Sequence, residues 1–134
     1  MAHHYMEEVN LELQKIIDEA MALGHEGDLG KAIRRLSGAL DILVAGAKSY
    51  AQKCEPVSEN DRGVSDQYLI KFNEYLKKDK TACVLSNAMA LMFAKNGNVS
   101  SAVIFFEQAI DLTPAGMVYD DPHIGLEMLK GEGR

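Results

Sequence analysis

The sequence predicts an all-α protein built from antiparallel helical hairpins. Residues that favour helix are abundant among its 134 residues, and proline occurs three times. Apolar residues recur at spacings of three and four along six segments, which is the helical period. One hairpin-like pattern occurs twice. The length fits a single domain over residues 1–134.

The first two segments predict one hairpin. Apolar spacing predicts a helix over about residues 5–23, and Asp28 is suited to cap a second helix over residues 29–54. Gly38 and Gly46 lie inside this long helix, where glycine lowers helix stability. We therefore expect both glycines to mark close packing against neighbouring helices.

Residues 56–63 form the predicted linker, and Ser65 is suited to cap a third helix that ends at a cluster of lysines. The expected apolar face of this third helix consists of Tyr68, Leu69, Phe72, Tyr75 and Leu76.

Three further helices are predicted in the second half of the chain. The fourth, over about residues 81–95, is apolar on most sides, so we expect it to lie between other helices. The fifth begins at Val99 and stops before Pro114. The sixth spans residues 121–131 and begins with a proline at its first turn. We expect it to bury Ile124, Met128 and Leu129.

An internal repeat connects the two halves. The pattern of residues 20–42 returns 70 positions later, over residues 90–112. Small residues in both copies allow two helices to approach closely, and a glycine in each copy permits the tight turn between them. The matching pairs include Ala20/Ala90, Gly27/Gly97, Ala32/Ala102, Leu36/Phe106 and Ala39/Ala109.

This pattern resembles the tetratricopeptide repeat, a 34-residue helix-turn-helix unit. The copies would span residues 13–46 and 83–116, with a diverged unit over 47–82 and a capping helix over 121–131. The resemblance implies a right-handed array of helix pairs that acts as an adaptor for a protein or peptide partner. The groove positions that it implies are Gln14, Ile17, Met21, His25, Val84, Asn87, Leu91 and Lys95.

The groove residues also indicate the kind of partner. The family members that hold chaperone tails need a Lys and two Asn, but this chain has Ile17, Met21 and Ala88 at those places. The groove is apolar and contains methionine, which suits an amphipathic helix better than an acidic tail. The alternative is that these residues belong to the core and are covered by the third or the last helix.

Residues 5–80 also resemble a microtubule-interacting-and-trafficking domain, a three-helix bundle. The long second helix and its loop agree with that pattern. The Arg-Ala-Glu sequence usual in the third helix of such domains is missing. This resemblance would imply a trafficking adaptor.

Composition argues against several function classes. The net charge of −6 disfavours nucleic acid and anionic membranes as partners. We find no apolar run of signal-peptide or membrane-helix length, which predicts a cytoplasmic location. Cys54 and Cys83 do not form a disulfide framework.

Candidate catalytic features are few. His3, His4, Glu7 and Glu8 have a spacing that suits a metal, but we interpret them as a polar terminus. The turn at His25 is interpreted as solvated. We expect no enzyme activity and no cofactor. A structural homodimer is the alternative function, closed by apolar groups such as Met117, Val118 and Tyr119.

Overall fold

The computed structural model describes residues 10–54 and 66–132. Within these ranges the chain forms six α-helices and no strand, which confirms the all-α prediction. The helices are α1 (Leu11–His25), α2 (Leu29–Cys54), α3 (Asp66–Leu76), α4 (Thr81–Lys95), α5 (Val99–Asp111) and α6 (Asp121–Glu132).

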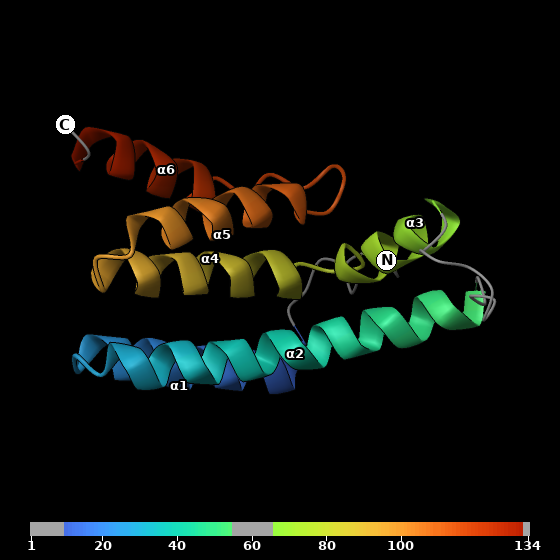
Figure 1. Ribbon diagram of the computed structural model, residues 1–134, viewed down its shortest axis with the longest axis horizontal. Helices are drawn as coiled ribbons and strands as arrows, with labels where there is room; N and C mark the ends of the chain where they lie inside the picture. Colours follow the sequence, from blue (N-terminus) through green and yellow to red (C-terminus); the bar gives the residue numbers. More distant parts are fainter. Residues whose placement is uncertain (1–9, 55–65, 133–134) are drawn as a thin grey trace.

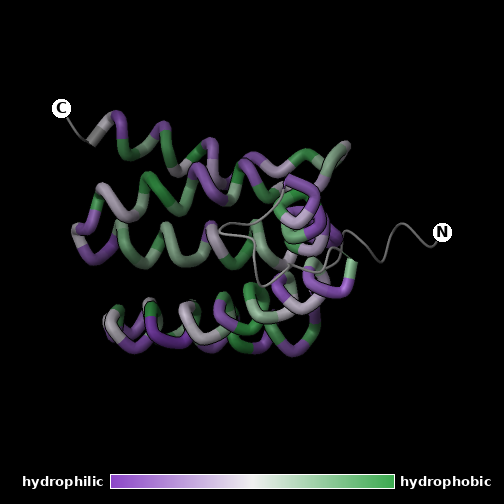
Figure 2. Tube along the Cα trace, turned by 45° about the vertical axis from the view of Figure 1, so that its right-hand side comes forward, coloured by the Kyte–Doolittle hydropathy of each residue, from purple (hydrophilic) through white to green (hydrophobic). Residues whose placement is uncertain are grey.

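The helices are stacked in layers (Figure 1). The α1–α2 pair forms the base, and α4, α5 and α6 follow above it in that order. The α3 helix lies over the carboxyl-terminal half of α2. Figure 2 shows that α4 is hydrophobic along most of its length. It contacts α1, α2, α5 and α6, so its predicted position between other helices is confirmed.

The two hairpin turns have the same geometry. Gly27 has a φ of 91° and Gly97 a φ of 82°, values in the left-handed region that favours glycine. The residue after each glycine donates its backbone N–H to a carbonyl oxygen in the last turns of the preceding helix. The bond gives a partner to a carbonyl that has none within the helix. These bonds are Asp28 N to Leu23 O and Asn98 N to Phe93 O, both 2.9 Å.

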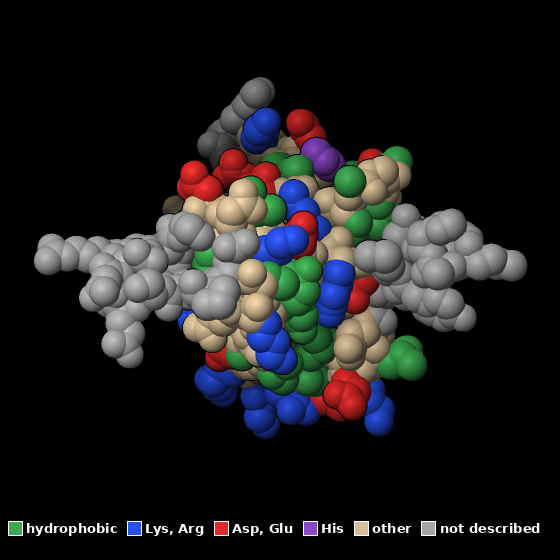
Figure 3. Space-filling model, turned by 90° about the vertical axis from the view of Figure 1, so that its right-hand side faces the viewer, with side chains coloured by type: hydrophobic (Ala, Val, Ile, Leu, Met, Phe, Trp, Pro, Cys, Tyr) green, Lys and Arg blue, Asp and Glu red, His purple; other side chains and the backbone are tan. Residues whose placement is uncertain are grey.

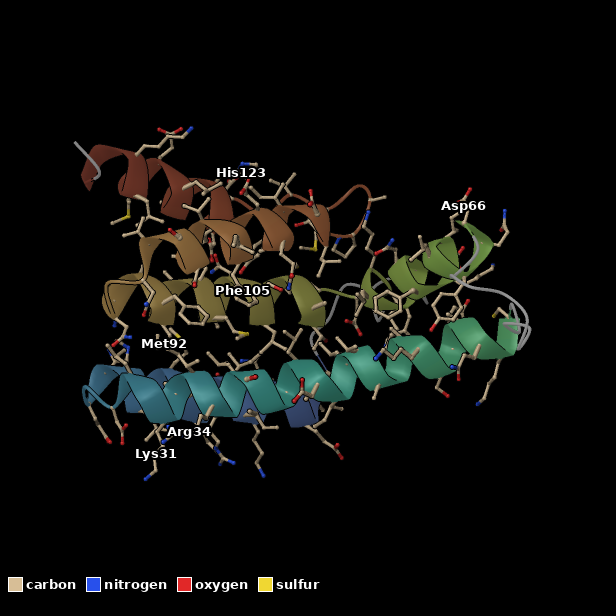
Figure 4. The ribbon with its side chains drawn as sticks, viewed as in Figure 1. Lys31, Arg34, Asp66, Met92, Phe105 and His123 are labelled. Atoms are coloured by element: carbon tan, nitrogen blue, oxygen red, sulfur yellow. The ribbon has the colours of Figure 1, made fainter. Side chains whose placement is uncertain are left out.

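The core follows the repeated positions. Leu36 and Phe106 plug the two hairpins and are at most 1% exposed. Ala32 and Ala102 are fully buried, so the paired helices approach closely at both places. Met92 lies between α4 and the base pair of helices, as Figure 4 shows, and it is also fully buried.

The amino end of α1 differs from the prediction. Asn10 is not helical, and its side chain accepts hydrogen bonds from the backbone of Glu12 (3.0 Å) and Leu13 (3.3 Å). The N–H of Asn10 donates to the hydroxyl of Thr81 at 2.7 Å. The predicted start of this helix at residue 5 is therefore wrong, because Asn10 caps the helix and is tied to α4.

Other predicted features lie outside the described residues. These are the linker over 56–63, the cap at Ser65 and the cluster of His3, His4, Glu7 and Glu8.

The two glycines inside α2 have opposite surroundings. A Cβ at Gly46 would collide with the ring and hydroxyl of Tyr75, so the predicted close packing is confirmed there. A Cβ at Gly38 would meet no described atom within 4 Å, so the same prediction is wrong for Gly38. On α3, Tyr68 is buried, but Leu69 is 45% exposed and does not join the buried face.

The α6 helix also departs from the prediction. Leu129 is buried as expected, and Gly125 lies so close to the Phe106 ring that a Cβ would collide with it. Ile124 and Met128 are 55% and 62% exposed, so their predicted burial is wrong. The helix turns its small residue toward α5, because only glycine permits this close approach. Two large apolar side chains are thereby left at the surface.

Candidate functional site

The structure divides the predicted groove residues between core and surface. On α1, Ile17 belongs to the core with 4% exposure, Gln14 and Met21 are half-buried, and His25 is exposed. None of these four residues lines a cavity described below.

The residues on α4 are distributed differently. Asn87 is 6% exposed, Val84 and Leu91 are half-buried, and Lys95 is exposed. Asn87, Leu91 and Lys95 line two adjoining cavities that open between α4 and α6. The predicted α4 positions therefore lie along a hollowed surface.

We call this hollow the α4–α6 groove. One part has a volume of about 270 Å³, and the adjoining part has a volume of about 180 Å³. Both parts include Leu91, Gly125 and Met128. The other lining residues are Asn87, Ala94, Lys95, Phe106, Asp121, Ile124 and Leu129.

Ile124 and Met128 form an apolar ridge beside the groove. The two residues are one helical turn apart on α6, so their side chains stand on the same face. A third hollow of about 390 Å³ lies along the same two residues and includes Asp120, His123 and Glu127. Figure 4 shows His123 on the outer side of α6. We call Ile124 and Met128 the α6 ridge.

A buried polar group lines the groove. The Oδ1 atom of Asn87 has no hydrogen-bond partner among the described residues, although the side chain is 6% exposed. Burial raises the pKa of Tyr119, and the side chain of Asn87 acts on this pKa in the opposite direction. A buried acceptor without a partner is costly in free energy, so this oxygen is suited to accept a hydrogen bond from a ligand.

Charges of opposite sign border the two ends of α6. Asp120 and Asp121 lie at its amino end, where acidic groups interact favourably with the helix dipole. Lys130 lies in the last turn with its side chain 72% exposed, and its Nζ is 4.0 Å from a carboxylate oxygen of Glu127. Exposed pairs of this kind add little to stability, so Lys130 is available to a partner.

A separate cleft of about 610 Å³ lies where α3 packs on α2. Figure 3 views this end of the molecule, where lysine or arginine side chains border an apolar strip. The Tyr50 hydroxyl donates to Glu74 at 3.2 Å, and the Lys78 ammonium lies 4.1 Å from the centre of the Tyr75 ring. Glu74 also raises the pKa of Lys71 through a hydrogen bond. Tyr50 and Glu74 of this cleft therefore contact each other, as do Lys78 and Tyr75.

The described residues contain no group of three or more His, Cys, Asp or Glu side chains placed to hold a metal ion. Cys83 is buried, and burial raises the pKa of its thiol, whereas Cys54 is exposed. Asp28 accepts a hydrogen bond from the backbone of Lys31 at 3.3 Å, as its predicted capping role requires. No helix in residues 10–54 and 66–132 is long and apolar enough to cross a membrane.

Sequence reasoning missed the α6 half of the groove. The available signal was Gly125 within the apolar pattern of a short helix, with Ile124 before it and Met128 one turn later. Of the residues predicted to close a dimer, Val118 is 83% exposed, and Met117 and Tyr119 are half-buried.

Comparison with known proteins adds no relative. The chain matches no protein-family model, and neither curated proteins nor solved structures give a significant match. The resemblances to the tetratricopeptide repeat and to the microtubule-interacting-and-trafficking domain therefore stay predictions from the sequence.

Proposed function

We propose that this chain is a protein-interaction module that binds an amphipathic helix in the α4–α6 groove. The observation that carries the proposal is the exposed α6 ridge beside an apolar hollow, since adjoining apolar surface of this kind is typical of interaction sites. An amphipathic helix presents apolar side chains every three or four residues, which suits a groove that follows two helices.

The repeat pattern supports the same surface. In tetratricopeptide proteins the first helix of each unit lines the binding groove, and α4 is the first helix of the second predicted copy. Asn87 and Leu91 were both predicted as groove residues, and both lie along the α4–α6 groove.

Charge at the ends of the groove would set the orientation of a bound helix. Asp121 lies at one end and Lys95 at the other. A bound helix with a basic residue near Asp121 and an acidic residue near Lys95 would form a favourable charge pair at each end of the groove. The unpaired Oδ1 of Asn87 would favour a partner with a hydrogen-bond donor among its apolar residues.

The proposal can be tested with a displayed library of amphipathic helical peptides. Peptides selected on the wild-type protein should lose most of their binding to Met128→Asp, because a carboxylate would then have to be desolvated beside the groove. Met128 is 62% exposed, so the variant should fold normally.

Ile104→Asp is the matched control, because Ile104 is 60% exposed on α5 and lines none of the groove cavities. It should bind the selected peptides as the wild type does. Selected peptides that bind Met128→Asp and wild-type protein equally would show that the groove is not the binding site.

A further inference from the structure

The α4–α6 groove and the α6 ridge place a recess and a projection side by side on one surface. Ile124 and Met128 project from α6, and the apolar hollow lined by Leu91 and Gly125 lies directly beside them. A two-fold symmetric interface requires this property, because each copy must present both a projection and a matching recess.

From this juxtaposition we infer that the helix bound in the groove is α6 of a second copy of this chain. Two copies pair through antiparallel α6 helices about a two-fold axis, and the ridge of each copy is seated in the α4–α6 groove of the other. The inference rests on the proposed function, since both use the same groove.

The charges and the dipole of α6 favour the antiparallel orientation over the parallel one. Asp120 and Asp121 lie at the amino end of α6, and Lys130 lies near its carboxyl end. Antiparallel pairing about the middle of the ridge brings Asp120 and Asp121 of one copy to the carboxyl end of α6 in the other, which carries Lys130 together with the acidic Glu127 and Glu132. It also opposes the two helix dipoles, which is favourable. Parallel pairing would place aspartate beside aspartate and lysine beside lysine, and like charges repel.

The same pairing accounts for the outer hollow of α6. His123 and Glu127 border this hollow on the far side of the ridge from the groove. They stand one turn apart near the middle of α6, so antiparallel pairing about the ridge brings His123 of one copy within about 3 Å, along the helix axis, of the level of Glu127 of the other. Both sides of the ridge would then have complementary contacts.

The size of the surface indicates that α6 does not act alone. A standard interface buries about 800 Å² on each partner, near one tenth of the 8506 Å² accessible surface of this chain. The 12 residues of α6 make a rod only about 18 Å long. Residues of α4, such as Leu91 and Lys95, must therefore contribute, and they line the groove that receives the ridge.

Sedimentation over about 1 µM to 1 mM protein tests the pairing, because interfaces near the lower size limit dissociate in this range. The apparent mass should rise from 14.7 kDa toward twice that value. Ile124→Asp and Met128→Asp should raise the dissociation constant by at least about tenfold, since each would bury a carboxylate.

Two control variants locate the interface. Ile104→Asp changes an equally exposed isoleucine on α5 and should dimerise as the wild type does. Val118→Asp changes a residue that is 83% exposed but lines no groove cavity, and it should also dimerise normally. Loss of the dimer in either control, with a normal dimer in Met128→Asp, would overturn the inference.

Cysteine cross-linking tests the orientation. In a Cys54→Ser background, which removes the exposed native thiol, protein carrying Ile124→Cys is mixed with protein carrying Met128→Cys. Under oxidised glutathione the mixed disulfide between positions 124 and 128 should form faster than either symmetric disulfide. Faster formation of the 124–124 disulfide would indicate parallel helices and would overturn the antiparallel arrangement.

The inference and the proposed function can fail separately. A wild-type protein that stays monomeric at about 1 mM but binds helical peptides in the groove would overturn the second copy as the occupant and retain the groove as a binding site. A monomeric protein that binds no helical peptide would overturn both. A dimer abolished by Met128→Asp would support both.

Discussion

The hairpins α1–α2 and α4–α5 share a sequence pattern and a turn geometry, but they occupy different environments. Four of the 15 residues of α1 are buried, against ten of the 15 residues of α4. The difference arises because α4 has neighbours on several sides, whereas α1 packs mainly on α2. A repeated signature therefore specifies how a hairpin forms, and the position in the stack decides how much of it is covered.

The second helices of the two hairpins also differ. Residue 114 is proline and its counterpart in the first hairpin is Val44, so α5 ends at Asp111 while α2 continues to Cys54. Gly116 then adopts a φ of 82° in a turn, whereas its counterpart Gly46 is helical. Proline disfavours helix in the residue before it and cannot donate a backbone hydrogen bond, which explains the divergence.

The largest expected effect comes from the residues that plug the two hairpins. Phe106→Ala should lower the free energy of unfolding by about 3–5 kcal/mol, and Leu36→Ala by about 2–5 kcal/mol, because both leave cavities in a closed core. Both side chains are at most 1% exposed. Urea denaturation of the two variants measures these losses. A loss below about 1 kcal/mol in only one of them would show that the hairpins are not equivalent.

The next effect tests the divergence of the second helices. Val44→Pro should destabilise the protein by about 3 kcal/mol or more, because proline inside α2 removes a backbone hydrogen bond and clashes with the preceding turn. Val44→Ala is the control for the lost side chain, and it should be much milder. Circular dichroism and urea denaturation report helix content and stability. A fully stable Val44→Pro would contradict the assignment of α2 as one continuous helix.

A smaller effect should distinguish the two glycines of α2. Gly46→Ala should cost about 1–3 kcal/mol, because the added methyl group collides with Tyr75 of α3. Gly38→Ala should instead add about 0.5–1 kcal/mol of stability, since alanine favours helix and the site is open. Thermal and urea denaturation of the two variants should give changes in the free energy of unfolding that have opposite signs. If both variants were destabilised or both were stabilised, this result would contradict the packing of α3 on α2.

The smallest expected effect is a loss of stability at alkaline pH. Burial raises the pKa of the Cys83 thiol above its ordinary value of 9.0, and burial likewise raises the pKa of Tyr119. The unfolded chain therefore releases these protons first. The stability they contribute is present below pH 9.0 and is lost as the pH rises through the folded-state pKa values.

Urea denaturation between pH 8 and pH 11 should thus show a falling free energy of unfolding. Just above pH 9.0, the ordinary pKa of the thiol, Cys83→Ala should reduce the slope of the free energy of unfolding against pH. An unchanged slope in this variant would contradict the contribution of Cys83. Its burial can be checked separately, because iodoacetamide should label the exposed Cys54 long before Cys83.

The two ends of α1 show what sequence reasoning can and cannot predict. Its carboxyl end was predicted near residue 23 and lies at His25, two residues before Gly27, whose turn is a local requirement. Its amino end depends on Asn10, which is held by the hydroxyl of Thr81 across 71 positions of sequence. Apolar periodicity continues past Asn10 toward residue 5, so the pattern alone placed the start too early.

The candidate site likewise has one part that the sequence predicts and one part that depends on contacts between distant residues. The α4 residues Asn87 and Leu91 were predicted from the repeat, because their positions in the helix follow from its period. The α6 ridge was predicted to be buried, because periodicity identifies an apolar face but not whether a neighbour covers it. The close contact of Gly125 with Phe106 turns α6 so that Ile124 and Met128 remain exposed.

The sequence by itself determined the six helices of the described residues, the bounds of α2, the approximate bounds of α4 and two equivalent glycine turns. These features depend on hydrogen bonds and torsion angles within a few residues, so local residue types suffice to specify them. The tertiary structure alone decided the burial of α4 on several sides, the packing of Gly46 against Tyr75 and the exposure of the α6 ridge. Each of these depends on contacts between residues far apart in the chain, which periodicity within one helix does not record.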